Sequence, residues 1–503
     1  MKNIFIKALA GVMLTAGATS CGDKFLETDI YNAVDLDTGL STPTSIGYAL
    51  NGAYYRLSQY YFSGNYANNI GDIMSDITYW NGKTNHFNSL YSCTYVDTDI
   101  YLSYIWQDGY KVVDNSARIL KAIDELLPEA NAADAAELQR YKAEAHALRA
   151  YAMLYMTNIY GHQVKVNGQD FSNELGVVVV NEPVEAFAEV KRNSVGECYT
   201  QILSDLNASL TAFQAAGEWS NEKVVFTPAS VYGVMARTKL YLEDWAGAAD
   251  AAKNALSAAG ISSVASTEAA YDALYQSTYS NSESLFYLAL DVKTNWSANS
   301  CGTLYTTYNY SPSPYLMSLY GENDIRTSIF NWTVEGGTEY APYGATTPIF
   351  GGGKFGFGNF DQVRGGNPAV QTTYLINAPE MFLIQAEAAV KQNDVNTAKA
   401  ALFTVAKRNQ DITSVNDLPG TADALMSFIQ DERARELFQE GHRLWDLRRW
   451  GKTTNLYAYD APNVNYMFKN IVVSDVILPI PDSEINAGFG VEQTPNWAAT
   501  RPQ

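Results

Sequence analysis

The sequence predicts a mainly α-helical protein in which tetratricopeptide-like helical hairpins form a scaffold and a long loop-rich region interrupts it. Apolar residues recur at helical spacing through several long segments, and two pairs of these segments are joined by very short linkers. Residues 293–377 are instead rich in Gly, Tyr, Asn and Pro, a composition typical of loops with a few short strands. We therefore expect the scaffold at about 21–292 and 378–503, with the loop-rich region at about 293–377.

Pro and Gly mark the ends of the first long helices. Amphipathic patterns predict helices over 105–127 and 133–160, which stop at Pro128 and Gly161. Four consecutive Val residues at 177–180 favour extended backbone and predict a strand, and a helix is expected at about 196–215.

Two helical hairpins follow in the sequence, at 228–242 with 245–258 and at 379–391 with 396–408. The linker of the first is Glu243-Asp244, and small residues such as Ala236 and Ala248 allow its helices to pack closely. Further helix is expected over 422–450. The hairpins share no strict repeat, so we interpret them as degenerate tetratricopeptide-like units.

The N-terminus has the pattern of a lipoprotein export signal. Lys2 and Lys7 flank the start of a short apolar stretch that ends at Ala18. This stretch is too short to span a bilayer, which needs roughly 20 apolar residues. We expect residues 1–20 to be removed and Cys21 to carry the lipid that anchors the chain to a membrane. The alternative is an ordinary secretory signal followed by an incidental Cys.

Composition excludes several classes of function. The formal net charge is -20, and removal of Lys2 and Lys7 leaves -22, which argues against nucleic-acid binding. Cys93, Cys198 and Cys301 lie far apart and have no His nearby at ligand spacing, so no zinc site is expected. Either one disulfide or three buried thiols is consistent with this spacing. No phosphate-binding or nucleophile motif is present, and we expect no cofactor and no metal site, although a structural calcium remains open.

Aromatic residues are concentrated in two stretches of low charge, 54–110 and 294–350, within a chain of 35 Tyr and nine Trp. Tyr and Trp combine a broad apolar face with a polar edge, which suits sugar rings. The more ordinary interpretation of any single Tyr is packing. Pairs of aromatic and amide residues in these stretches are the candidate carbohydrate-binding residues: Tyr79, Trp80, Asn81, Asn295, Trp296, Tyr308 and Trp332. Asn81 and Asn295 are equally interpretable as turn residues.

Residues 431–452, DERARELFQEGHRLWDLRRWGK, form the most distinctive motif. Opposite charges at helical spacing, such as Asp431 with Arg435, Glu440 with Arg443 and Asp446 with Arg449, predict salt bridges rather than catalysis. Gly441 would weaken a helix, which indicates that another backbone approaches it closely.

This motif resembles the C-terminal signature of the SusD/RagB family of outer-membrane nutrient-binding lipoproteins. Cys21-Gly22-Asp23-Lys24-Phe25-Leu26, Asn51-Gly52-Ala53-Tyr54, residues 143–161, residues 381–394 and LPIPDSEI at 478–485 are similar to further family segments, in the expected order. The resemblance implies one SusD-like domain over 21–503 that is lipid-anchored at the cell surface. It also implies binding of oligosaccharide or polysaccharide and its delivery to a SusC-like TonB-dependent transporter, with no catalytic step.

Three other functions are open at this point. A RagB-like member of the same family would bind peptide, whereas the Tyr, Trp and Asn loops favour sugar. A glycosidase would need two carboxylates facing each other across a cleft, which the sequence cannot pair. A purely structural partner of the transporter would bind no ligand of its own.

Overall fold

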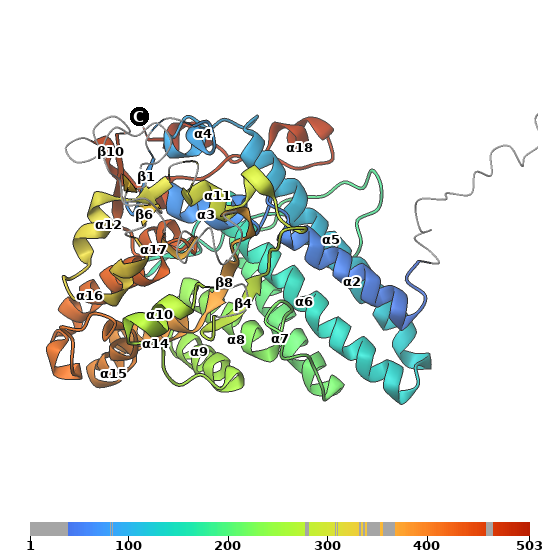
Figure 1. Cartoon of the computed structure of the whole chain (residues 1–503). Helices are drawn as coiled ribbons and strands as arrows, with labels where there is room; N and C mark the ends of the chain where they lie inside the picture. The colour runs from blue at the N-terminus through green and yellow to red at the C-terminus, as the bar shows by residue number, and fades with distance from the viewer. Residues whose placement is uncertain are drawn as a thin grey trace, which may run out of the picture.

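The computed structural model describes residues 39–80, 82, 84–276, 281–306, 308, 310–330, 333–334, 338–339, 353–355, 368–458 and 466–502. Helices dominate this part of the chain and form layered antiparallel pairs (Figure 1), so the predicted mainly α-helical fold is confirmed. Within the described residues, no helix has both the length and the apolar character needed to cross a membrane.

The helices are α2 (Pro43–Ser58), α3 (Tyr66–Ile73), α4 (Asn88–Tyr91), α5 (Ile100–Leu126), α6 (Ala132–Tyr160), α7 (Val195–Ala216), α8 (Pro228–Tyr241), α9 (Trp245–Ala259), α10 (Glu268–Ala273), α11 (Cys301–Thr306), α12 (Pro314–Leu319), α14 (Ala378–Lys391), α15 (Val395–Ala406), α16 (Ala422–Leu437), α17 (Arg443–Arg449) and α18 (Asp482–Ala487). The strands form two-stranded antiparallel pairs: β1 (Thr78–Trp80) with β5 (Tyr310–Pro312), β2 (Lys165–Val166) with β3 (Gln169–Asp170), β4 (Ser284–Leu288) with β8 (Thr373–Asn377), β6 (Thr333–Val334) with β7 (Thr338–Glu339), and β9 (Thr453–Tyr457) with β10 (Tyr466–Val472).

The two predicted hairpins use the same turn chemistry. In α8–α9, Glu243 takes a left-handed φ of 56°, and the Asp244 side chain accepts a hydrogen bond from the Gly247 N–H at 3.0 Å. In α14–α15, Asn393 has φ 61° and Asp394 accepts from the Thr397 N–H at 3.0 Å. Each turn therefore reverses the chain with one left-handed residue and then caps the next helix with an Asp side chain.

The strand predicted at 177–180 is wrong. The segment is extended, but its N–H groups do not join a strand ladder: Val178 N–H donates to the Tyr110 hydroxyl at 2.7 Å, and Val179 N–H to Asn193 Oδ1 at 3.0 Å. Side chains of α5 and of a neighbouring loop thus provide the hydrogen-bond partners that a second strand would have provided.

The helix predicted over 422–450 is interrupted at residues 438–442, between α16 and α17. Gly441 lies in this turn with a left-handed φ of 76°, and a Cβ there would overlap the carbonyl oxygen of Asn68 in α3. Conversely, a Cβ on Gly71 would overlap the carbonyl oxygen of Gly441. The predicted close backbone approach at Gly441 is therefore confirmed, although it occurs in a turn rather than within a helix.

The buried carboxylate of Asp72 fastens the same turn to α3. Its Oδ2 accepts hydrogen bonds from the N–H groups of Gln439 at 2.8 Å and Gly441 at 3.1 Å, and its Oδ1 accepts from the Arg443 N–H at 3.3 Å. Burial raises the pKa of Asp72 to about 7, although the three backbone donors oppose that shift. One side chain thus satisfies three backbone groups that would otherwise be buried without partners.

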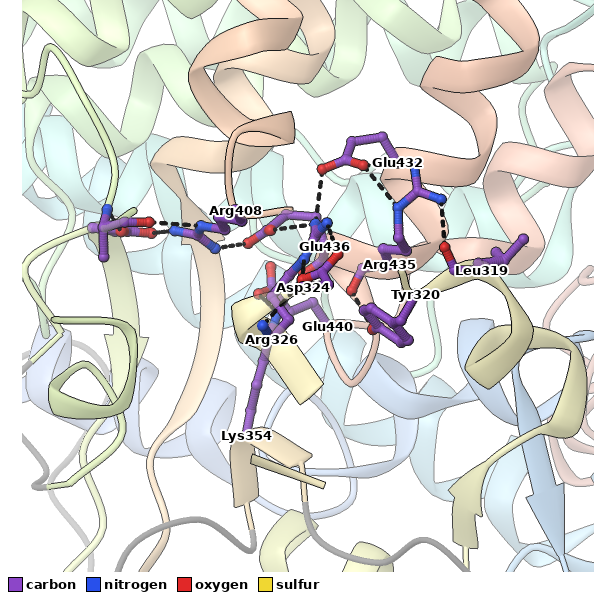
Figure 2. A network of polar contacts seen from close by, with 12 residues as sticks. Leu319, Tyr320, Asp324, Arg326, Lys354, Arg408, Glu432, Arg435, Glu436 and Glu440 are labelled. Carbon is purple, nitrogen blue, oxygen red and sulfur yellow. Dashed lines mark hydrogen bonds and ion pairs between the residues drawn. The ribbon is translucent and has the colours of Figure 1, made fainter. Parts of the chain in front are cut away.

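Buried ion pairs connect α16 to the segments that precede it in the sequence (Figure 2). The Arg326 guanidinium contacts Asp324 at 2.7 Å, Glu432 at 2.8 Å and Glu436 at 3.1 Å, while Arg408 bridges Glu436 and Glu283. Burial by itself would raise the pKa of Glu432, but Arg326 and Arg435 outweigh it and hold that pKa at about 2.

These contacts confirm that the charges of residues 431–452 are structural. Asp446 pairs with Arg449 at 2.9 Å, as the spacing predicts. The other two predicted pairs are wrong, because both arginines have different partners: Arg435 contacts Glu432 at 2.7 Å, and Arg443 contacts Asp76 at 2.8 Å. Helical spacing identifies neighbours on one helix, whereas Arg443 finds its carboxylate on a distant segment.

Gly441→Ala is expected to destabilise the protein by several kcal/mol, since Ala at that φ is strained and its methyl group would overlap the Asn68 carbonyl. Gly52→Ala is the matched control, because Gly52 lies in α2 and a Cβ there meets nothing within 4 Å. It should stabilise α2 by about 0.5–1 kcal/mol. Urea unfolding of both variants checks this pair, and equal midpoints would contradict it.

Glu144 is expected to make the free energy of unfolding fall as the pH rises from about 4.5 to 7. Burial raises the pKa of Glu144 from 4.5 to about 7, against the opposing effects of the Tyr54 hydroxyl and Arg140. Between these values the folded state holds a proton that the unfolded chain has released, so stability present below pH 4.5 is lost through pH 7. Glu144→Gln should remove about 1–3 kcal/mol of this dependence. Urea unfolding at several pH values measures it, with the half-exposed Glu137→Gln on the same helix as the control; an unchanged slope for Glu144→Gln would disprove the assignment.

Candidate functional site

The first short sheet brings the two predicted aromatic stretches together. β1 and β5 pair antiparallel, with Tyr79 opposite Ser311 and Trp80 opposite Tyr310. The rings of Trp80 and Tyr310 are stacked, with centroids 6.2 Å apart and planes 13° apart. An early segment and a segment more than 200 residues later thus form one structural unit.

Tyr79 and Trp80 are nevertheless buried, with exposed fractions of 3% and 6%. The indole N–H of Trp80 donates to Thr84 Oγ1 at 3.3 Å, and the Thr84 hydroxyl donates to the Tyr308 carbonyl at 3.1 Å. Neither ring offers an open face to a ligand in this structure. Trp80 therefore supports the surface around Tyr308 from beneath rather than forming it.

Trp296 lies at the surface, half-buried against the end of α2. Its indole N–H donates to the Ser58 carbonyl at 2.9 Å, and its ring lies 6.0 Å from Tyr55 and 6.1 Å from Tyr60. Asn295 beside it is a turn residue: its Nδ2 donates to the Asp291 carbonyl at 2.8 Å, and its Oδ1 accepts from the Ser297 N–H at 3.0 Å. The turn interpretation of Asn295 is thus the one that the geometry favours.

Trp296 belongs to a row of partly exposed rings, which we call the aromatic row: Tyr55, Trp296, Tyr60, Tyr61 and Tyr104. The centroids of Tyr60 and Tyr61 are 3.9 Å apart, and those of Tyr61 and Tyr104 are 4.2 Å apart. Burial and the neighbouring Tyr61 hydroxyl raise the pKa of Tyr60 above its ordinary value. Its hydroxyl, like that of any Tyr at neutral pH, can donate a hydrogen bond. The row therefore combines ring faces with hydroxyl donors along one edge of the molecule.

The sequence pattern does not distinguish the four Tyr residues of this row from the other Tyr residues nearby. The signal was the density of Tyr over 54–110, but nothing in that pattern separates the half-exposed Tyr60 from the buried Tyr91 or Tyr95. Which of these Tyr rings are exposed depends on which of them the segment around Trp296 covers. That covering is a long-range contact of the folded chain and leaves no local signal in the sequence.

Amide side chains of α3 hold this segment in place. Asn65 Nδ2 donates to the Asn299 carbonyl at 2.7 Å, and Asn69 Nδ2 donates to the Cys301 sulfur at 3.0 Å. The Tyr305 hydroxyl donates to Asn69 Oδ1 at 3.1 Å. Because α3 is itself fastened to the turn at 438–442, residues 431–452 help to set the position of Trp296.

The three described cysteines, Cys93, Cys198 and Cys301, are buried free thiols. The sequence was consistent with either one disulfide or three buried thiols, and the structure has the three thiols. The Cys301 thiol donates to the Gly64 carbonyl at 3.0 Å. No group of three or more His, Cys, Asp or Glu residues within the described ranges is arranged to hold a metal ion.

The aromatic row is continuous with the rings around Trp80. Tyr60 contacts Tyr66 at 5.5 Å, Tyr66 contacts Phe87 at 5.1 Å, and Phe87 contacts Tyr310 at 6.5 Å. At the far end the half-buried Tyr308 stacks on His86 at 3.8 Å. Trp296 and Trp80 therefore share one aromatic network, whereas Tyr308 is linked to Trp80 through the Thr84 hydroxyl. Of the other predicted residues, Cys21, Asn81 and Trp332 lie outside the described residues.

A separate cavity of about 430 Å³ lies beside α5 and contains none of the predicted site residues. It is lined by Trp106, Tyr110 and five Val residues, with a few polar groups at its edge. Trp106 is buried there and contacts the rings of Tyr110 and Tyr160.

Comparison with known families decides the classification. The model of the SusD family matches residues 246–497, and a second model, described as starch-binding and associating with the outer membrane, matches residues 24–242. The chain belongs to the SusD family. Together the two matches span the scaffold, the signature motif and both aromatic stretches, which agrees with the order of motifs in the sequence.

Solved structures of SusD superfamily proteins share this fold. One from Bacteroides thetaiotaomicron is 21% identical, with a TM-score of 0.76 over 90% of this chain and 100% of its own. One from Bacteroides vulgatus is 22% identical, with a TM-score of 0.76 over 91% and 99%. A SusD-like carbohydrate-binding protein from Bacteroides vulgatus is 21% identical, with a TM-score of 0.68 over 82% and 85%. No curated protein sequence matches the chain.

Trp80→Ala is expected to destabilise this SusD-family protein by about 3–5 kcal/mol, because it removes a large buried ring that packs on Tyr310 and Tyr91. Trp296→Ala should cost about 1 kcal/mol, since its ring is half-exposed and its single side-chain hydrogen bond goes to Ser58. Denaturant unfolding of the two variants distinguishes a supporting Trp from a surface Trp. Equal losses of stability would contradict that distinction.

Proposed function

We propose that this SusD-family protein captures oligosaccharide or polysaccharide on the aromatic row and passes it to a SusC-like TonB-dependent transporter. The observation that carries the proposal is the row itself, in which five partly exposed rings lie with neighbouring centroids 3.9–6.1 Å apart: Tyr55, Trp296, Tyr60, Tyr61 and Tyr104. Sugars present C–H faces to aromatic planes and hydroxyls to polar edges, so they match such a surface.

Support also comes from the family. One family model is described as starch-binding and associating with the outer membrane, and one structural relative is a carbohydrate-binding protein. Lipid attachment at Cys21 would place the protein at the outer-membrane surface beside its transporter. The role is capture and release, without a catalytic step, and family members act as binding proteins.

Affinity is expected to be modest. One ring–sugar contact contributes about 1 kcal/mol, taking aromatic pairs as the guide. Two or three such contacts alone total about 2–3 kcal/mol, which corresponds to a dissociation constant of several millimolar or weaker, so affinity in the micromolar range also requires hydrogen bonds to the sugar hydroxyls. Weak capture suits a protein that must release its cargo to a transporter.

The test uses residues 22–503 on a panel of plant, host and microbial polysaccharides, by affinity electrophoresis and then calorimetry. Trp296→Ala and Tyr60→Ala should each weaken binding about fivefold, as the loss of one ring contact requires. Trp219→Ala is the control, because Trp219 is 41% exposed and packs on Phe213 outside the row.

Retardation that survives both substitutions would show that the sugar binds elsewhere. Absence of retardation on every polysaccharide would overturn glycan capture and favour peptide cargo or a lid without a ligand of its own. Release of reducing ends from any polysaccharide would revive a hydrolytic function.

A further inference from the structure

The outer face of α2 carries two of the most exposed aromatic side chains in the described chain. Tyr48 is 73% exposed and Tyr55 is 56% exposed. Gly52 lies between them, four residues after Tyr48 and three before Tyr55, so all three share one face of the helix. We call Tyr48, Gly52 and Tyr55 the α2 strip.

Packing within the protein does not require a glycine at position 52. A Cβ on Gly52 would meet nothing within 4 Å, whereas a Cβ on Gly47, one turn earlier, would lie 2.8 Å from the Tyr141 hydroxyl. Glycine weakens a helix relative to alanine, so the sequence accepts a loss here that the fold does not explain. The consequence is an open stretch of helix backbone between two exposed Tyr side chains.

The α2 strip continues the aromatic row. Tyr55 belongs to both, since its ring lies 6.0 Å from Trp296. Tyr48 is seven residues further back, which places it about 10 Å along the helix axis. The outward positions of this stretch, Thr44, Tyr48, Asn51, Gly52 and Tyr55, have no charged side chain, although the protein as a whole has a net charge of -20.

We propose that the α2 strip extends the glycan site, so that the ligand is an extended chain of several sugar residues that crosses Gly52 between the rings of Tyr48 and Tyr55. A long, uncharged track of spaced rings fits the side of a chain, whereas recognition of a chain end would need a closed pocket. Gly52 lets the chain approach the helix backbone between two ring contacts. This inference rests on the proposed function and specifies its substrate class.

The experiment compares fragments of one polysaccharide that retards the wild-type protein, prepared by partial hydrolysis and separated into short and long fractions. Calorimetry measures both fractions on the wild-type, Tyr48→Ala, Gly52→Gln and Trp296→Ala proteins. Gln at position 52 favours the helix but fills the open stretch, so thermal unfolding should show no loss of stability. Phe187→Ala is the control for an exposed ring elsewhere, since Phe187 is 85% exposed.

Tyr48→Ala and Gly52→Gln should each weaken binding of the long fraction about fivefold and leave the short fraction unchanged. Trp296→Ala should weaken both fractions. If long fragments bind Tyr48→Ala and Gly52→Gln with wild-type affinity while Trp296→Ala still weakens binding, the extended track is wrong and the proposed function stands. If no polysaccharide binds the wild-type protein, both are wrong, and the α2 strip would instead be a protein contact.

Discussion

The buried ion pairs around Arg326 are the constraint on which the rest of the structure depends. Arg326 contacts Glu432 and Glu436 on α16 and also Asp324, while Glu436 in turn holds Arg408 (Figure 2). Removal of one partner from such a network leaves a buried charge without compensation, at a cost of about 3–5 kcal/mol. The network therefore fixes α16 against the middle of the chain with little freedom of position.

A series of direct contacts connects α16 to the candidate site. The turn that follows α16 fits against α3 where Gly71 and Gly441 meet, and the Asp72 carboxylate fastens it there. The next residues of α3 toward its start, Asn69 and Asn65, then hold the segment that contains Trp296. Residues 431–452 thus help to determine where a surface ring lies, although Trp296 is more than 130 residues away in the sequence.

Local sequence signals predicted the helices well, because Pro, Gly and apolar spacing act within a few residues. They failed where a distant group decides the outcome. The Tyr110 hydroxyl takes the N–H that would have paired a strand at 177–180. Nor do local signals show how far a predicted site residue is exposed: Tyr310, 230 residues away in the sequence, stacks on Trp80, which is only 6% exposed. The aromatic row was anticipated as a composition, but its members depend on this same long-range packing.

The thiol of Cys301 has a practical consequence. Burial raises its pKa to about 11, although the Asn69 amide opposes that shift, and the sulfur lies beneath the segment that presents Trp296. An alkylating reagent can reach the sulfur only when that segment detaches from α3, since a buried, protonated thiol is unreactive. The rate of alkylation therefore reports the free energy of this local opening, separately from global unfolding. The protein thus contains its own chemical probe of how firmly the loop beside α2 is held, and ligand on the aromatic row would slow the reaction.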